Sequence, residues 1–203
     1  MSFGAPTIKT HSSVDARPVK PVKIVVTGPS SAGKTTLIGT ISEVDVVRTD
    51  RTVSDTDLSV KASTTVAMDF GRVTVDDDCV LFLFGTPGQR RFQLMWEILS
   101  EGMVAFILLV NATDARYVDE AADVLTTFND YADVPYVVGV THLDEIDLPA
   151  DDIVDYVRSR LAPSGDAKVV ACDVRRKEDV KQLILEALYG VMNRLEEASA
   201  RRP

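Results

Sequence analysis

The chain has 203 residues, of which 45% are hydrophobic and 26% charged, and its net charge at pH 7 is −9. This length fits one well-buried domain, and the composition excludes both an intrinsically disordered chain and a membrane protein built from long apolar runs. The acidic balance also argues against a protein that coats nucleic acid, because affinity for the phosphate backbone comes mainly from Lys and Arg. We expect a globular protein in which any anionic ligand needs a locally positive pocket.

Cysteine content and apolar runs indicate the compartment. Cys79 and Cys172 are too few and too far apart to predict a disulfide framework or a zinc site, which fits a reducing environment. The opening MSFGAPTIKT lacks the apolar core of a signal peptide. The longest apolar run, Met103–Val110, is far short of the roughly 20 residues that cross a bilayer. We therefore expect a cytoplasmic protein without an intrinsic membrane anchor.

The chain divides into three parts by composition. Residues 1–20 contain scattered Pro, Ser and charged residues without periodicity, which predicts a flexible N-terminal leader, with a partner-binding arm as the alternative. Residues 21–198 carry the apolar periodicity of a single domain, and 199–203 form a short C-terminal tail. No internal repeat is visible.

Short apolar runs alternate with helical patterns along the domain. The runs, rich in Val, Ile and Phe, are VKIVVTG, CVLFLFG, GMVAFILLV, PYVVGVT and AKVVAC. Their continuous apolarity predicts strands buried on both faces, as in a mostly parallel sheet covered by helices. Apolar residues recur at helical spacing between 118 and 128 and between 180 and 191, which predicts core-facing helices there. The segments TTVAMDFGRVTVD and CVLFLFG predict a hairpin through the acidic turn at 76–78.

The strongest local motif is GPSSAGKT at 28–35, which follows an apolar strand and precedes a helical pattern. This is the context of a P-loop, whose backbone N–H groups surround phosphate oxygens at a helix N-terminus. Lys34 is expected to reach the β- and γ-phosphates, and the Thr35 hydroxyl to bind Mg²⁺. The nucleotide-binding residues predicted from this segment are Gly28, Ser31, Ala32, Gly33, Lys34, Thr35 and Thr36.

A second motif, GTPGQ at 85–89, ends the apolar strand that begins at Cys79. Sheet order is expected to bring it beside the γ-phosphate, where the Gly88 N–H would contact that phosphate and Gln89 would orient the attacking water. The predicted catalytic residues are therefore Gln89, Lys34 and Gly88. The alternative is a plain turn with an exposed glutamine.

Five segments in order, GPSSAGKT, TTVAMDFG, LFGTPGQRRF, THLD and ACD, make the chain resemble a bacterial Ras-like small GTPase. The resemblance is closest to the actinobacterial conservon GTPases and more distant to the MglA-like gliding-motility GTPases. It implies an α/β P-loop NTPase fold, a three-layer sandwich with a mostly parallel six-stranded sheet and helices on both faces. It also implies a guanine-nucleotide switch that binds GTP or GDP with Mg²⁺ and hydrolyses GTP slowly.

The same resemblance assigns further site residues. Thr65, or alternatively Thr64, would join Thr35 as the second protein ligand of Mg²⁺. Recognition of the base would fall to THLD, in which Asp144 accepts hydrogen bonds from guanine N1 and N2. The base-site residues implied by the resemblance are Thr141, His142, Asp144, Ala171 and Cys172.

One position departs from the pattern of eukaryotic relatives, because Gly85 stands where an acid holds Mg²⁺ through a water. Asp69 is a nearby carboxylate by sequence and a candidate replacement. No arginine finger is assignable among the candidates Arg48, Arg51, Arg90 and Arg91, which predicts slow hydrolysis and an activating partner. The resemblance implies a roadblock-type partner and a sensor-kinase-like component.

Two interpretations of Phe92 and Trp96 stay open: they pack in the core, or they form a partner surface beside Arg90 and Arg91, since aromatic residues and arginine dominate interface hot spots. Two other functions stay open. One is a nucleotide-binding scaffold without useful hydrolysis, which Gly85 and the altered THLD motif favour. The other is a P-loop ATPase or small-molecule kinase, against which Gln89 and Asp144 argue.

Overall fold

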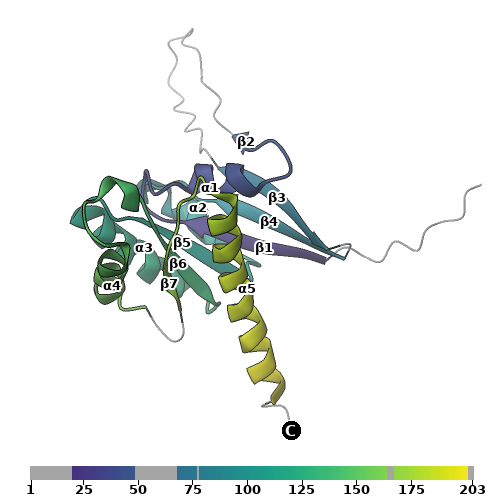
Figure 1. The fold of residues 1–203 in the computed structure, drawn as a ribbon. Coiled ribbons are helices and arrows are strands. Elements are labelled where there is room, and N and C mark those ends of the chain that lie inside the picture. Colours follow the sequence, from purple (N-terminus) through teal and green to yellow (C-terminus); the bar gives the residue numbers. More distant parts are fainter. Residues whose placement is uncertain (1–19, 49–67, 77, 164–166, 201–203) are drawn as a thin grey trace, which may run out of the picture.

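The computed structural model describes residues 20–48, 68–76, 78–163 and 167–200. Seven strands in this part of the chain form one sheet, in the order β2-β3-β4-β1-β5-β6-β7 (Figure 1). Their bounds are β1 Lys20–Thr27, β2 Val47–Arg48, β3 Asp69–Asp76, β4 Cys79–Gly85, β5 Ala105–Asn111, β6 Tyr136–Thr141 and β7 Val169–Ala171. Strands β4, β1, β5, β6 and β7 run parallel, whereas β2 and β3 are antiparallel additions at one edge. The predicted α/β fold is confirmed, with six strands apart from the two-residue β2.

Helices cover both faces of the sheet. The α-helices are α1 Lys34–Ile41, α2 Gln93–Ser100, α3 Ala115–Tyr131, α4 Ala150–Leu161 and α5 Lys177–Ala200, and two short 3₁₀ helices are η1 Arg90–Phe92 and η2 Leu143–Glu145. None of the described helices has the length and apolar character needed to cross a bilayer.

The alternation of side chains along β1 divides the core into two layers. Ile24 and Val26 pack with residues of α1 and α5, whereas Val25 packs with residues of α2, α3 and α4. Because successive side chains of a strand point to opposite faces, a strand that is apolar throughout needs helices on both sides. This is why the continuous apolar runs predicted the three layers correctly.

The β3–β4 hairpin is present as predicted, and its register matters for the site. Asp69 at the start of β3 lies opposite Gly85 at the end of β4. The expected leader at 1–20 lies outside the described residues except for Lys20. The same holds for Thr64, Thr65 and residues 49–63 of the segment 43–63, which the resemblance implies is a first switch.

Candidate nucleotide-binding site

The loop between β1 and α1 has the backbone that a P-loop requires. Gly28 has φ +139°, and a Cβ there would lie 2.3 Å from the backbone O of Leu109 on β5. Ser31 and Gly33 also have positive φ, and Gly33 is the N-cap of α1. The loop therefore curls over the N-terminus of α1, where unpaired backbone N–H groups and the helix dipole favour a phosphate.

Lys34 lies in the hollow of this loop. Its side chain is buried, and Nζ donates hydrogen bonds to the backbone O of Gly28 at 2.8 Å and of Pro29 at 2.6 Å. Burial lowers the pKa of Lys34 from 10.5 to about 8, and the nearby Asp69 carboxylate acts in the opposite direction. An amine held in this way is positioned for phosphate oxygens, whose negative charge would favour its protonated form.

Thr35 and Asp69 meet beneath the P-loop at the position where a P-loop protein holds Mg²⁺. Thr35 Oγ1 donates to Asp69 Oδ2 at 2.5 Å. A Cβ on Gly85 would lie 3.0 Å from Asp69 Cβ and 2.9 Å from Ile38 Cδ1, so an acid at Gly85 would collide with the one on β3. The acid missing before T-P-G-Q is thus matched by one on the opposite strand.

A hydroxyl and a carboxylate oxygen suit Mg²⁺, which prefers oxygen ligands and takes the rest from waters and phosphates. In the described part of the chain, no group of three or more His, Cys, Asp or Glu residues could hold a metal ion by itself. A bound triphosphate would therefore have to complete the coordination shell. The expected ligand Thr65 lies outside the described residues.

The GTPGQ loop lies against the P-loop. The Thr86 N–H donates to Val26 O at 3.0 Å, and the hydroxyls of Thr86 and Thr27 hydrogen-bond at 3.0 Å. A Cβ on Gly88 would lie 2.6 Å from the backbone N of Ser30, so only glycine allows this approach. Gln89 is exposed and lines a cavity of about 370 Å³ with residues of the P-loop and α3. The two predicted catalytic motifs are therefore adjacent, as the sequence suggested.

The aromatic and basic residues after Gln89 do not all face solvent. Trp96 is buried, and its Nε1 donates to Pro87 O at 2.8 Å, so core packing is the interpretation that holds for this residue. Arg90 forms an ion pair with Asp123 of α3, and the Arg91 guanidinium lies 4.8 Å from the centre of the Phe92 ring. Both arginines are exposed.

A second pocket, of about 320 Å³, lies beside the N-terminus of α1, next to the loops that follow β6 and β7. Its lining contains Gly33, Thr36, His142, Asp144, Ala171 and Cys172, all of which the sequence analysis assigned to nucleotide binding. Loops after β6 and β7 bring them together, because the carboxyl ends of parallel strands meet at one edge of the sheet.

Thr141 was predicted to bind the base, but its side chain contacts the P-loop and β5 instead. Its side chain is buried, and Oγ1 donates toward Ala32 O and Val110 O, each at 3.2 Å. His142, with φ +61°, places Nδ1 2.8 Å from the same hydroxyl. Thr141 therefore joins β6 to the P-loop and does not line the pocket.

Cys172 offers little to a base. Its N–H donates to Val140 O at 2.9 Å, and the next N–H, that of Asp173, donates to Asp179 Oδ2 at 3.1 Å. Burial raises the pKa of the Cys172 thiol to about 12, so the thiol is neutral and unreactive. The resemblance implied that a backbone N–H of the segment 170–173 meets guanine O6, and two N–H groups of this segment, those of Cys172 and Asp173, already have partners within the protein.

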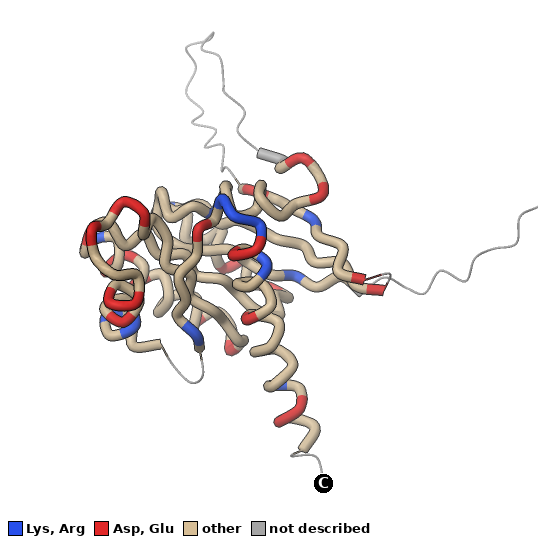
Figure 2. The backbone as a smooth tube through the Cα atoms, in the orientation of Figure 1, with Lys and Arg blue, Asp and Glu red and all other residues tan. Residues whose placement is uncertain are grey.

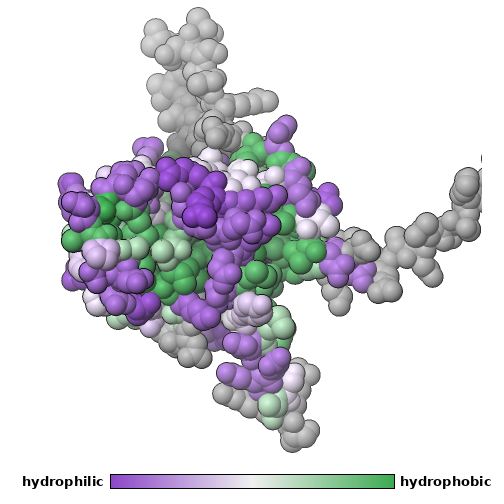
Figure 3. Space-filling view, in the orientation of Figure 1, coloured by the Kyte–Doolittle hydropathy of each residue, from purple (hydrophilic) through white to green (hydrophobic). Residues whose placement is uncertain are grey.

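Arg175 is a pocket residue that the sequence analysis missed. Its Nη2 donates to Asp144 Oδ2 at 2.9 Å, and its Nε donates to Asp173 Oδ1 at 2.8 Å. Hydrogen bonds from Arg175 lower the pKa of Asp173 to about 2, and the two carboxylates raise the pKa of Arg175 further. Figure 2 shows the basic run that leads into α5 beside acidic segments, and Figure 3 shows hydrophilic residues gathered over the same loop. The run of three cations at 175–177, which follows ACD after one valine, was the available signal.

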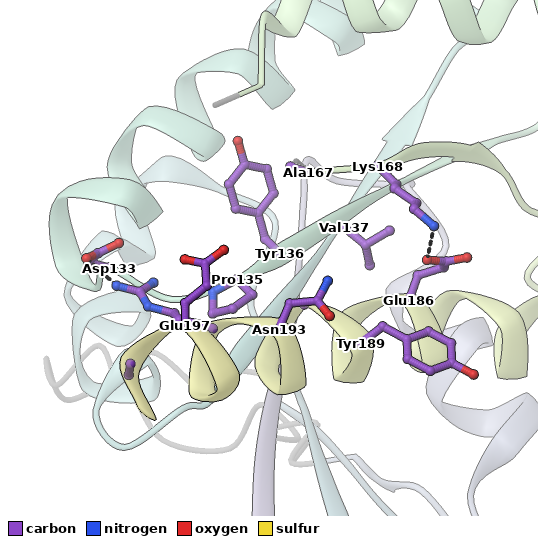
Figure 4. Close-up of a pocket in the computed structure, with 13 residues that line it drawn as sticks. Asp133, Pro135, Tyr136, Val137, Ala167, Lys168, Glu186, Tyr189, Asn193 and Glu197 are labelled. Atoms are coloured by element: carbon purple, nitrogen blue, oxygen red, sulfur yellow. Dashed lines mark hydrogen bonds and ion pairs between the residues drawn. The ribbon is translucent and has the colours of Figure 1, made fainter. Parts of the chain in front are cut away.

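Another cavity lies at the opposite end of the sheet and is unrelated to the P-loop. It has a volume of about 550 Å³ and is lined by the start of β6 and by α5 (Figure 4). Among its lining cations, Lys168 pairs with Glu186 at 2.7 Å and Arg194 pairs with Asp133. Because both cations are already neutralised, this cavity is a poor candidate for a triphosphate.

The fold and the loop geometry define a P-loop nucleotide-binding protein. A family model described as a conserved hypothetical ATP binding protein matches residues 26–186, and the chain belongs to this family. An uncharacterized protein from the archaeon Methanocaldococcus jannaschii is 27% identical over 144 residues, which cover 71% of this chain and 84% of the relative.

The family match corrects the resemblance to Ras-like, conservon and MglA-like GTPases, which is wrong as a family assignment. The resemblance rested on the motifs GPSSAGKT and TPGQ, whose residues contact phosphates. Different P-loop families share these motifs because binding the same phosphate groups requires the same backbone conformation. Gly85, Thr141 and His142 differ from the Ras-like GTPase pattern, and these three differences were the evidence in the sequence against that family.

Proposed function

We propose that this chain is a Mg²⁺-dependent ATPase with slow intrinsic turnover. The observation that carries the proposal is the Thr35–Asp69 contact, which supplies a hydroxyl and a carboxylate for Mg²⁺ next to the P-loop and the GTPGQ loop. The family description supports ATP as the nucleotide. The P-loop ATPase, the less favoured alternative in the sequence, thus becomes the leading function.

Each residue has a defined task in this reaction. The N–H groups of the P-loop and the Lys34 amine bind the phosphates, and bound Mg²⁺ would neutralise charge on the β- and γ-phosphates. The Gly88 N–H contacts the γ-phosphate, and Gln89 orients a water molecule. That water attacks the γ-phosphorus, the new P–O bond forms as the bond to the ADP oxygen breaks, and inorganic phosphate leaves with the proton released to solvent.

Slow turnover follows from the positions of the arginines beside the site. Arg90 pairs with Asp123 and Arg91 lies over Phe92, so neither is engaged at the phosphate end. An arginine finger contributes 10³–10⁵ in rate, and neither Arg90 nor Arg91 supplies one, whereas the side chains of the other candidates, Arg48 and Arg51, lie outside the described part of the chain. We therefore expect a slow enzyme that an activating partner would accelerate. A roadblock-type or sensor-kinase-like partner was implied only by the corrected resemblance, so we retain the activating partner without naming its class.

GTP hydrolysis is the second candidate, and Asp144 is the residue that favours it. Guanine presents two donors, N1 and N2, to a carboxylate, whereas adenine presents one donor and one acceptor. Asp144 is paired with Arg175, so the pocket offers an acceptor beside a donor, and this combination matches the adenine edge directly. Guanine needs Arg175 to turn toward O6 while Asp144 accepts from N1 and N2.

Titrations with ATP and GTP, together with Mg²⁺-dependent phosphate release, test both candidates. We expect tighter ATP binding and hydrolysis that falls about 10- to 100-fold in Asp69→Asn, with a higher Mg²⁺ requirement. The matched control is Asp130→Asn, an exposed acid on α3 that should leave the rate unchanged. Selective GTP binding would establish the second candidate. Nucleotide binding without phosphate release would favour the hydrolysis-deficient scaffold.

A further inference from the structure

Helix α5 is longer than the body it packs on. It has 24 residues and is therefore about 36 Å long. Its buried residues, Val180, Leu183, Ile184 and Ala187, all lie in its first half. Figure 1 shows the second half projecting beyond the sheet. Leu188 and Val191 still pack partly against the core, but core packing does not explain the exposed Met192 and Leu195 farther along the helix.

One side of α5, next to its buried face, carries an apolar stripe, which we call the α5 seam: Leu185, Leu188, Met192 and Leu195. Three of these side chains are exposed, at 44% for Leu185, 53% for Met192 and 63% for Leu195, and Leu188 is half-buried. The spacing of three, four and three residues is that of the a and d positions in a coiled coil. Single exposed leucines are normal on a surface, but four at this spacing form a continuous docking face.

We propose that the α5 seam binds the α5 seam of a second copy of this chain, in antiparallel orientation. The seam has the same spacing when it is followed from either end. In an antiparallel pair, Leu185 faces Leu195 of the second copy, and Leu188 faces Met192 of the second copy. A two-fold interface requires this reciprocity, because residue i must contact j while j contacts i.

The charges beside the seam select the antiparallel orientation. Lys181 precedes the seam by one turn, and Glu196 follows its last leucine. Lys181 pairs with Glu178 of its own helix at 3.0 Å, an exposed contact that is easily exchanged. Parallel pairing would set Lys181 against Lys181 of the second copy, whereas antiparallel pairing puts it within reach of Glu196 of the second copy. Parallel pairing would also bring both bodies to the same end of the helix pair, while antiparallel pairing separates them and opposes the helix dipoles.

Two heptads make a small interface. A stable interface usually buries more than about 1,200 Å², and four apolar side chains from each copy fall short of that. The dimer should therefore be weak and depend on concentration, with dissociation in the micromolar range or above. Because the seam lies away from the P-loop, the dimer does not depend on the proposed ATPase.

Sedimentation of the full chain across a concentration series tests the association. We expect a concentration-dependent dimer in the wild type, and Leu195→Glu should weaken it by at least about 100-fold, since the two-fold axis introduces each charge twice. The matched control is Leu148→Glu, a 64% exposed leucine in the loop before α4, which should leave the dimer intact. A wild type that stays monomeric at several hundred micromolar, or equal losses in both variants, would overturn the proposal.

Cysteine cross-linking tests the orientation. Tyr189 lies beside the seam near the expected two-fold axis and is 52% exposed. We expect Tyr189→Cys to form a disulfide with its own copy under mild oxidation, and a mixture of Leu185→Cys and Leu195→Cys chains to cross-link with each other. Leu195→Cys alone should stay uncross-linked, as should the wild type with its buried Cys172 and half-buried Cys79. Cross-linking of Leu195→Cys with itself would indicate parallel pairing and overturn the proposal.

Discussion

The two ends of the nucleotide pocket are built in different ways. At the phosphate end, backbone atoms contact backbone atoms, as where Gly28 meets Leu109 and Gly88 meets Ser30. At the base end, exposed side chains contact one another, chiefly Arg175 with Asp144 and Asp173. Backbone contacts depend on the fold and tolerate little change, whereas an exposed ion pair can be altered at small cost. Chemistry common to all nucleoside triphosphates is thus fixed by the fold, and the choice of base rests on side chains.

The largest effect is expected from Gly28→Ala at the phosphate end. The new Cβ would lie 2.3 Å from Leu109 O on a backbone with φ +139°, so we expect a loss of about 3 kcal/mol or more in the free energy of unfolding. Nucleotide affinity should fall with it, by more than about 100-fold. Urea denaturation and a binding titration measure the two effects.

Gly102→Ala is the matched control for this change. Gly102 also has positive φ, +69°, but no atom lies within 4 Å of an added Cβ. It should cost only about 1 kcal/mol, the strain of the left-handed backbone alone. Equal destabilisation by both variants would remove the close approach as the reason for glycine at position 28.

A smaller effect is expected from pH, also at the phosphate end. Because the pKa of Lys34 is about 8 before nucleotide binds, half of the protein lacks this charge at pH 8. Phosphate favours the protonated amine, so binding takes up a proton above pH 8, and affinity should fall by up to about tenfold per pH unit there. Below about pH 7 the Lys34 amine is charged in both the free and the nucleotide-bound protein, so its titration should no longer change the nucleotide affinity. Titrations between pH 6 and 9.5 measure this, and Lys34→Ala should abolish the slope.

The smallest effect is expected where the two ends meet, at Thr141. Thr141→Val removes the buried hydrogen bonds to Ala32 O and Val110 O, which should cost about 1–2 kcal/mol of stability. The ratio of ATP to GTP affinity should stay the same, because this hydroxyl does not line the pocket. Asp144→Ala should do the reverse, changing that ratio by several-fold with little loss of stability. A changed ratio in Thr141→Val would return this residue to the base site.

The same difference explains what the sequence could predict. Apolar runs such as 22–28 and 102–110 determined the three-layer fold, because a strand buried on both faces leaves few alternatives. The P-loop motif located the phosphate end, since its glycines are demanded by close backbone contacts. The Arg175–Asp144 pair could not be predicted, because it joins loops after different strands and depends on side-chain positions.

The assignment to Ras-like GTPases was wrong because it relied on the phosphate end of the pocket. Motifs that contact phosphate are nearly alike among P-loop proteins, so GPSSAGKT and TPGQ could not discriminate one family from another. The sequence left the burial of Trp96 open because its helical position allowed either face, and the structure shows it buried with a hydrogen bond to Pro87 O. Residues that depend on long-range packing were thus the least predictable.

The pairing of Gly85 with Asp69 has a consequence for how such sites are found. The two residues face each other on one rung of the β3–β4 ladder, and that rung has room for one acidic side chain. Reciprocal exchange, Gly85→Asp with Asp69→Gly, should therefore move the carboxylate across the rung and keep it near Thr35. A linear search for an acid before T-x-G-Q would miss this chain, whereas a search over aligned strand pairs would find it.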